Sequence, residues 1–159
     1  MGPDPGSPGL QLIVFLLEGQ RYALHLSVVE RVLPMVAVSL LPKAPPVALG
    51  VINFHGQVIP VVDIRLRFGL AARDYGLTAH LLLAHSARRS LAVPADEVLG
   101  VREVAAEAIT SPEAVLPGIG HVAGIATLSD GLLFIHDLDA FLSLDEEQRL
   151  TEALEETKG

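Results

Sequence analysis

The segment of residues 50–69 constrains the fold of this chain more than any other part of the sequence. Two apolar runs within it flank the pair His55 and Gly56. Glycine supplies the positive φ angle that a tight hairpin turn requires, so the segment predicts two antiparallel strands joined by a short turn. Proline cannot donate a hydrogen bond to a neighbouring strand, so Pro60 predicts that the second strand lies at a sheet edge or contains a bulge.

The arrangement of this segment occurs a second time near the end of the chain. Gly50 leads through the first turn to Asp63, and Gly124 leads through a second glycine-containing turn to Asp137. The spacing from glycine to aspartate is the same in both places, and a phenylalanine follows soon after each aspartate. An internal repeat of this kind predicts two similar small β-barrels.

The composition favours sheet and excludes several classes of protein. Half of the residues are hydrophobic but only 4% are aromatic, so the core must be built from Val, Leu, Ile and Ala, of which the β-branched residues favour strands. The net charge of −8 would repel a phosphate backbone, so we expect no nucleic-acid partner. The absence of cysteine excludes a disulfide framework and a thiolate nucleophile, and fits a reducing cytoplasm. Pro, Gly or charge interrupts each apolar run before the ~20 residues of a membrane-spanning helix, so we expect a soluble protein without membrane insertion.

Turn and capping residues divide the rest of the chain into short elements. Residues 1–9 are rich in proline and glycine, which predicts a disordered leader. Ser27 is placed to cap a short helix at residues 27–31, and a capping box at Ser143 predicts a terminal amphipathic helix. Residues 105–120 are polar and predict a long loop. The remaining strands are expected at residues 11–18, 21–26, 36–41, 78–85, 89–95, 99–104, 121–128 and 131–137.

The segment of residues 50–69 resembles the signature of the CheW-like family, the adaptor domains of bacterial chemotaxis arrays. The matching residues are Gly50, Val51, Asn53, Gly56, Val58, Pro60, Val61, Asp63, Arg65, Phe68 and Gly69. The resemblance implies an all-β fold with short helices, in which two SH3-like five-stranded β-barrels pack together, and it implies no enzymatic activity, no metal and no cofactor. The expected domain spans residues 10–144, with approximate sub-barrels at residues 10–70 and 77–142, and residues 145–159 form a C-terminal helix and tail.

The resemblance also implies a set of partners. Proteins of this family couple a CheA-type histidine kinase to the cytoplasmic tip of a chemoreceptor, a methyl-accepting chemotaxis protein. They bind the regulatory domain of the kinase barrel to barrel, and they bind the helical hairpin of the receptor in a groove between the barrels. The implied protein is a stand-alone cytoplasmic adaptor that is recruited to membrane receptor arrays.

Two residues depart from the family pattern at positions that the family associates with partner contacts. His55 stands where arginine is usual, and Arg31 stands where glutamate is usual, with Glu30 displaced by one position. Histidine lacks the fixed fork of donors of arginine and titrates near neutrality. The expected partner-binding residues are His55, Arg31, Glu30, Val28, Val32, Gln57 and Val58. The residues of the structural motif are Gly50, Asn53, Gly56, Pro60, Asp63, Arg65 and Phe68, of which Asp63 and Arg65 form an ion pair that either braces the turn or faces a partner.

Two other hypotheses stay open at this point. One is a divergent CheW-like barrel that serves a signalling array unrelated to motility, and the other is a ligand-binding or enzymatic barrel that uses His55 in the cleft between the barrels. Known catalytic patterns are absent. Asp63 is not followed by the Thr-Gly of an acid protease, the histidines form no i, i+4 pair of a zinc hydrolase, and no serine lies in a Gly-x-Ser-x-Gly elbow.

Overall fold

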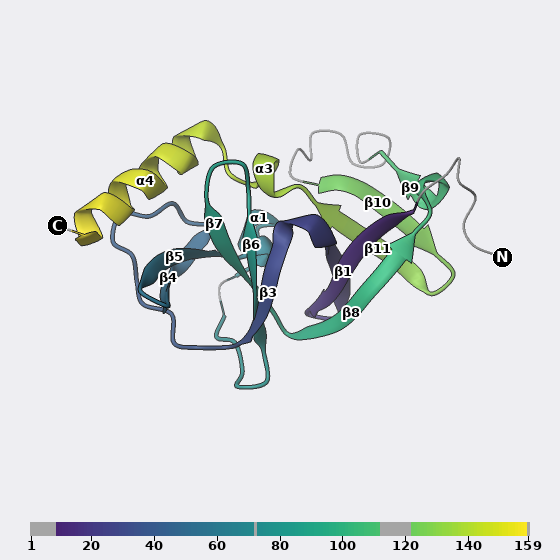
Figure 1. Ribbon diagram of the computed structural model, residues 1–159, viewed down its shortest axis with the longest axis horizontal. Coiled ribbons are helices and arrows are strands. Elements are labelled where there is room, and N and C mark those ends of the chain that lie inside the picture. Colours follow the sequence, from purple (N-terminus) through teal and green to yellow (C-terminus); the bar gives the residue numbers. More distant parts are fainter. Residues whose placement is uncertain (1–8, 72, 112–121, 159) are drawn as a thin grey trace.

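The computed structural model describes residues 9–71, 73–111 and 122–158 of the chain (Figure 1). The expected leader lies outside the described residues except for Gly9, and so does the expected loop from residue 112 onward. In the described part of the chain, strands dominate and the helices are short apart from the terminal one, as the sequence predicts.

Two sheets, in which most neighbouring strands are antiparallel, lie side by side (Figure 1). The first sheet has the order β8-β1-β2-β11-β10-β9 and the second has the order β3-β6-β7-β5-β4. The strands of the first sheet are β1 (Leu10–Leu17), β2 (Gln20–His25), β8 (Glu97–Val104), β9 (Ile109–Thr110), β10 (Val122–Leu128) and β11 (Gly131–His136). Those of the second are β3 (Val29–Pro34), β4 (Ala48–Phe54), β5 (Gln57–Val62), β6 (His80–His85) and β7 (Ser90–Ala95). The helical elements are η1 (Leu26–Val28), α1 (Ile64–Arg67), η2 (Ala106–Ala108), α3 (Leu138–Phe141) and α4 (Leu144–Lys158).

The internal repeat is confirmed at the level of local structure. Each half of the chain contains a hairpin, β4–β5 or β10–β11, in which the pairing register shifts just before Gly50 or Gly124. Each hairpin is followed by a short helix, α1 or α3, that is capped by Asp63 or Asp137. Each aspartate accepts a 2.9 Å hydrogen bond from the N–H two residues further on, which satisfies a donor at the start of the helix.

The division into sub-barrels at residues 10–70 and 77–142 is wrong, because the two halves exchange strands. After β2 the chain crosses through η1 to the second sheet, where β3 pairs with β6, and after β7 it returns to the first sheet, where β8 pairs with β1. Each hairpin also pairs in parallel with a strand of the other half: β11 with β2, and β5 with β7. The first sheet also contains the two-residue strand β9, which pairs with β10 of the same half, so only the second sheet has the expected five strands.

Four local predictions are also corrected. The short helix at residues 27–31 is only η1, and Ser27 does not cap it, because the valines from Val29 onward extend into β3. No strand forms at residues 36–41, where Ser39 makes an isolated bridge to Val51. The beginning of the expected loop forms η2 and β9. Pro60 is not at a sheet edge: it lies opposite Val51 in β5, between β4 and β7, and the register shift lies on the facing strand.

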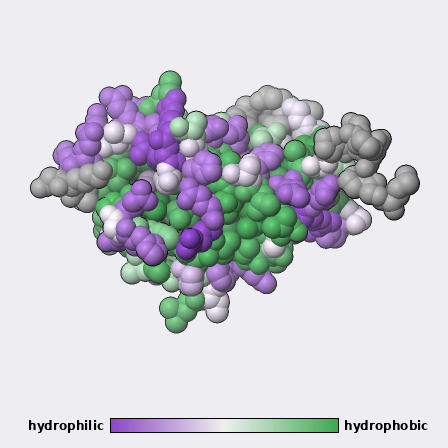
Figure 2. All heavy atoms as spheres, viewed as in Figure 1, coloured by the Kyte–Doolittle hydropathy of each residue, from purple (hydrophilic) through white to green (hydrophobic). Residues whose placement is uncertain are grey.

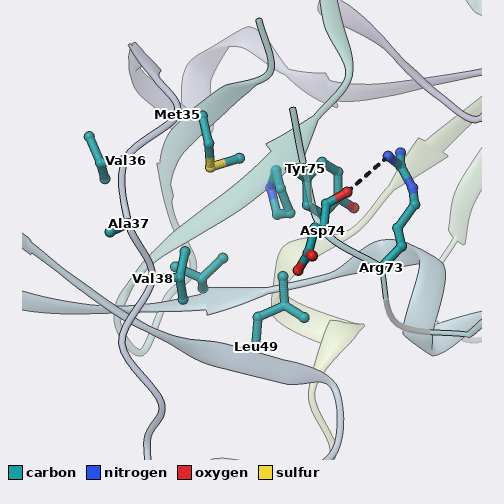
Figure 3. A pocket seen from close by; sticks show the side chains of 10 residues that line it. Met35, Val36, Ala37, Val38, Leu49, Arg73, Asp74 and Tyr75 are labelled. Carbon is teal, nitrogen blue, oxygen red and sulfur yellow. Dashed lines mark hydrogen bonds between the residues drawn. The ribbon is translucent and has the colours of Figure 1, made fainter. Parts of the chain in front are cut away.

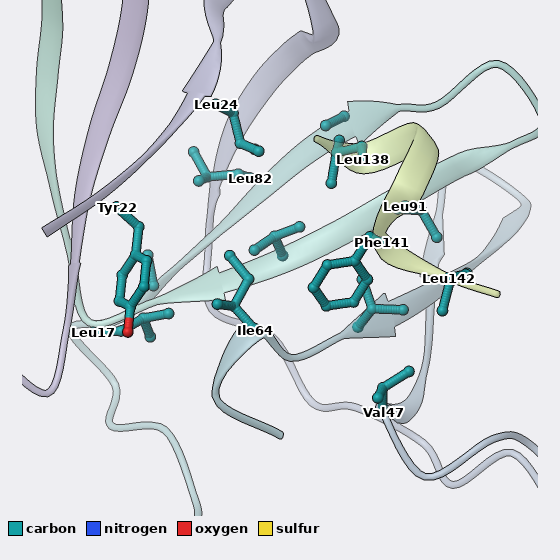
Figure 4. Close-up of a cluster of buried hydrophobic side chains, with 14 of the residues drawn as sticks. Leu17, Tyr22, Leu24, Val47, Ile64, Leu82, Leu91, Leu138, Phe141 and Leu142 are labelled. Atoms are coloured by element: carbon teal, nitrogen blue, oxygen red, sulfur yellow. The ribbon is translucent and has the colours of Figure 1, made fainter. Parts of the chain in front are cut away.

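The alternation of β1 shows how the sheets share their apolar residues. Ile13, Phe15 and Leu17 point into a central cluster between the sheets, whereas Leu12 and Val14 point into the interior of the first sheet. Figure 4 shows the central cluster, to which strands of both sheets and α3 contribute. A third cluster fills the interior of the second sheet. Because β1 has a buried face on both sides, its sequence is almost continuously apolar.

The terminal helix completes the fold by covering the central cluster. Its capping box is confirmed: the Glu146 N–H donates to Ser143 Oγ at 3.1 Å, and the Ser143 N–H donates to Glu146 Oε1 at 2.9 Å. Leu150 and Ala153 are buried in the central cluster. Arg67, after β5, and Arg89, before β7, pair with carboxylates of α4 and hold the helix against the second sheet.

Asp130, at the β10–β11 turn, ties three strands together and gives a pH-dependent contribution to stability. It accepts hydrogen bonds from Arg21 on β2 at 2.9 Å and from Arg102 on β8 at 3.3 Å, and these bonds lower the pKa of its carboxyl to about 2. A carboxyl whose pKa falls on folding contributes fully above its unfolded value of about 3.9, and the contribution is lost as the pH falls through the folded pKa.

We therefore expect Asp130→Asn to lower the free energy of unfolding at pH 7 and to do so less as the pH falls from about 4 toward about 2. Urea denaturation of both proteins at a series of pH values measures this difference. A difference that stays constant across the series would contradict the electrostatic origin of the contribution.

Candidate partner-binding surface

The β4–β5 hairpin ends in an exposed turn formed by His55 and Gly56. Their φ angles are +52° and +85°, as in the two-residue turns that match the twist of paired strands. The Asn53 side-chain oxygen accepts a 2.9 Å hydrogen bond from the Gly56 N–H and closes the turn. Asn53 and Gly56 of the motif thus hold His55 at the tip of the hairpin.

Phe54 brings together the two residues that depart from the family pattern. The His55 ring packs edge-on against the Phe54 ring, with 4.2 Å between centroids. The Arg31 guanidinium lies over the same ring, 5.5 Å from Cζ to the centroid, which is within the range of a cation–π contact. Nothing in the sequence singled out Phe54, because the family signature lies in its neighbours along the chain.

A pocket of about 270 Å³ opens beside these three side chains. Its apolar lining includes Leu33 and Val36 on one side and Ile52 and Phe54 on the other. β3 and β4 are the two edge strands of the second sheet, and the pocket lies where they approach each other. His55 lines this pocket, and Arg31 adjoins it through its contact with the Phe54 ring. We call the pocket, together with Arg31 and His55, the hairpin pocket.

The valines of β3 and β8 define a second surface. Val32 pairs with Leu82, and Val101 on β8 pairs with Ile13; both partners belong to the central cluster. Residues directly opposite each other on paired strands share a face, so Val32 and Val101 lie on the side that faces the boundary between the sheets. Their exposed fractions are 38% and 58%, and Figure 2 shows apolar side chains gathered over this middle part of the molecule. We call it the inter-sheet surface.

The expected partner-binding residues divide between these surfaces. Arg31 pairs with Leu83 of the second-sheet cluster, so it points to the opposite side of β3 from Val32. Gln57 and Val58 are exposed on the hairpin beside His55. The other two residues are elsewhere. Val28 is half-buried against the central cluster, and Glu30 occupies the bulge of β3 with its carboxylate 3.4 Å from His85 Nδ1.

Asp63 and Arg65 have internal partners. Asp63 is fully buried and accepts a 2.9 Å hydrogen bond from the Tyr75 hydroxyl, while Arg65, 3% exposed, pairs at 2.5 Å with Glu18 in the β1–β2 turn. Burial raises the pKa of Asp63 and of Tyr75. This network connects α1 to the first sheet, so its geometry supports bracing rather than contact with a partner. Phe68, which follows α1, packs 6.0 Å from the Tyr22 ring.

A larger pocket, of about 350 Å³, lies beyond this network (Figure 3). Met35, Val36 and Val38 line one side of it, and Arg73, Asp74 and Tyr75 line the other. The Arg73 guanidinium stacks on the Tyr75 ring at 4.5 Å and bonds to Asp96 at 2.5 Å. These polar groups are engaged with one another, and within the described residues no three His, Asp or Glu side chains converge to hold a metal.

The position of His55 does not support the hypothesis of a ligand site between the barrels. It lies at the hairpin pocket, whereas the histidines beside the boundary between the sheets are His25, His85 and His136. None of the helices in the described part of the chain is long and apolar enough to cross a membrane.

The fold is a duplicated, strand-exchanged pair of SH3-like barrels that exposes two apolar surfaces. The chain belongs to the CheW-like family, since the sequence model of the CheW-like domain matches residues 11–146. It is 30% identical to the chemotaxis protein CheW of Bacillus subtilis over 88% of this chain and 91% of that protein. It is 24% identical to CheW of Klebsiella aerogenes over 87% of this chain and 84% of that protein. The crystal structure of the scaffolding protein TtCheW from Thermoanaerobacter tengcongensis superimposes with a TM-score of 0.77 and 25% identity, covering 87% of this chain and 95% of that one.

Proposed function

We propose that this protein is a non-catalytic adaptor of chemotaxis-type signalling, which couples a CheA-type histidine kinase to the cytoplasmic tip of chemoreceptors. The match to the CheW-like domain over residues 11–146 carries this proposal. The similarity to CheW proteins over most of their own length supports it. The adaptor works in the cytoplasm and is recruited to membrane receptor arrays.

The two surfaces suit two different partners. The inter-sheet surface, with the exposed Val32 and Val101, is apolar and suits the apolar face of a receptor's helical hairpin. The hairpin pocket is small and concave, and its rim is formed by the edge strands β3 and β4. It suits the compact regulatory domain of the kinase, which approaches barrel to barrel. Information then passes through the relative placement of the partners and requires no chemical step.

Calorimetric titration against the purified regulatory domain of a CheA-type kinase from the same genome tests the proposal. We expect saturable binding that Val58→Asp weakens by about tenfold or more, because the change places a charge on an apolar contact. His55→Ala should weaken binding by a smaller factor.

The matched control is Leu132→Asp, because Leu132 occupies the same place in the β10–β11 hairpin as Val58 in β4–β5 and is also exposed. It should leave the affinity within about twofold of the unmodified protein. No binding of the unmodified, folded protein to any such kinase domain would overturn the proposed function.

A further inference from the structure

We infer that the hairpin pocket recognises a segment of the kinase regulatory domain that presents an apolar side chain with a carboxylate beside it. The inference rests on the proposed function and specifies the chemistry of the contact. It is carried by an arginine that has no carboxylate partner and lies over Phe54, one of the residues that line an apolar pocket, in a protein that is acidic overall.

Arg31 differs from nearly all other arginines of the described chain in its surroundings. Seven pair with a carboxylate of this protein: Arg21, Arg65, Arg67, Arg73, Arg89, Arg102 and Arg149. Within the residues that the structure describes, Arg31 and Arg88 have no such partner. The net charge of −8 makes carboxylates plentiful, so the isolation of Arg31 leaves a cation available to another molecule.

The neighbours of Arg31 hold this cation in place without neutralising it. The Phe54 ring lies under the guanidinium, and the adjacent carboxylate of Glu30 is directed to His85 instead. A guanidinium presents a planar fork of donors that matches both oxygens of a carboxylate. The His55 ring, on the same phenylalanine, adds a further polar group at the rim.

The pocket itself accounts for the apolar part of the recognised segment. Its volume of about 270 Å³ is small, below the ~300–1,000 Å³ of most small-molecule sites. Most of its lining is apolar, with Leu33, Pro34, Val36, Ile52 and Phe54, and Asn53 and His55 add polar groups. A concave apolar site of this kind suits an anchor side chain of a protein partner, surrounded by weaker polar contacts. An acidic residue next to that anchor would reach Arg31.

Charge reversal separates this inference from the proposed function. Arg31→Glu should weaken binding of the purified kinase regulatory domain by about tenfold or more, because it places two negative charges together. Arg88→Glu is the matched control, since Arg88 is also exposed and unpaired but lies in the β6–β7 turn, and it should leave the affinity within about twofold. Arg31→Gln should weaken binding less than Arg31→Glu and should reduce the loss of affinity on raising the salt concentration.

The variants give distinguishable outcomes. Equal affinities of Arg31→Glu and Arg88→Glu, or tighter binding by Arg31→Glu, would overturn the inference while leaving the adaptor function in place. Failure of the unmodified protein to bind would overturn the proposed function, and the inference with it. Replacement of exposed carboxylates of the kinase domain by lysine, one at a time, should identify one change that restores binding to Arg31→Glu, and restoration by none of them would also overturn the inference. Unchanged thermal melting of each variant shows that the effects arise at the contact.

Discussion

Gly50→Ala should destabilise the protein by about 3–5 kcal/mol, which is the largest effect that we expect from a single substitution. Gly50 has a φ angle of +154°, and a Cβ atom added there would lie 2.0 Å from the Ser39 carbonyl oxygen. No contact between these atoms is possible at that distance, so the backbone must move. The movement separates Ser39 from Val51. These two residues share two backbone hydrogen bonds, of 2.8 and 2.9 Å, which form the only bridge within the described residues between β4 and the segment that follows β3.

The magnitude follows from two contributions. An L-residue in a sparsely populated backbone conformation costs about 1–3 kcal/mol, and each hydrogen bond lost contributes about 1 kcal/mol. The repeat supplies the control. At Gly124 the only close contact of the added Cβ would be with Ile109 Cγ2, at 2.6 Å, since the Thr110 carbonyl oxygen lies at an ordinary 3.7 Å. A side chain can move where a backbone carbonyl cannot.

Gly124→Ala should therefore cost about 1 kcal/mol or less by comparison. Urea denaturation of the two variants measures both values, and hydrogen exchange at the Val51 amide reports the bridge directly. Equal losses of stability in the two variants would show that the contact with Ser39 is not the cause.

Asp63→Ala should destabilise the protein by about 3 kcal/mol, whereas Asp137→Ala should cost about 1 kcal/mol. Both aspartates cap a short helix through the N–H two residues further on, and removal of such a cap costs about 1 kcal/mol. Only Asp63 also accepts a hydrogen bond from the Tyr75 hydroxyl. Removal of the Asp63 carboxylate leaves the partly buried Tyr75 hydroxyl without an acceptor, at a cost of about 1–3 kcal/mol. The same change removes a negative charge near the buried Arg65.

The same denaturation experiment separates these contributions. Tyr75→Phe keeps the ring and the helix cap, and should cost about 1 kcal/mol. If Asp63→Ala does not fold, Asp63→Asn keeps the shape and one acceptor oxygen, and its loss of stability should still exceed that of Asp137→Asn. Equal losses for the two asparagine variants would mean that the network around Asp63 adds nothing to the cap.

Local features of the fold were predictable because their causes are local. A glycine in a turn, an aspartate before a helix and the capping box at Ser143 each act within a few residues, and the structure shows all three. The repeat was visible for the same reason. The short β3 strand was missed because the valines around Val29 suit a helix or a strand equally in isolation, and pairing with β6 decides between them.

The exchange of strands and the hairpin pocket could not be predicted from local patterns. Which sheet a strand joins depends on pairings between residues far apart in the chain, such as Leu10 with Val104, and the sequence carries no mark of them. The contact of Arg31 with Phe54 has the same origin, because it requires the two edge strands of the second sheet to approach. Arg31 was identified from the sequence, whereas Phe54 and its contact with Arg31 were not.

The exchanged strands also determine what the two halves of the chain are to each other. A half that ended after α1 would hold β1 and β2 without β8, and β3 without β6, so it would expose two unfinished sheets. Two copies of such a half, related by a twofold axis, would complete both sheets by giving each other the missing strands. The single chain thus has the architecture of a domain-swapped dimer whose subunits are covalently joined. Each of its sheets contains strands of both halves, so neither half holds a complete sheet by itself.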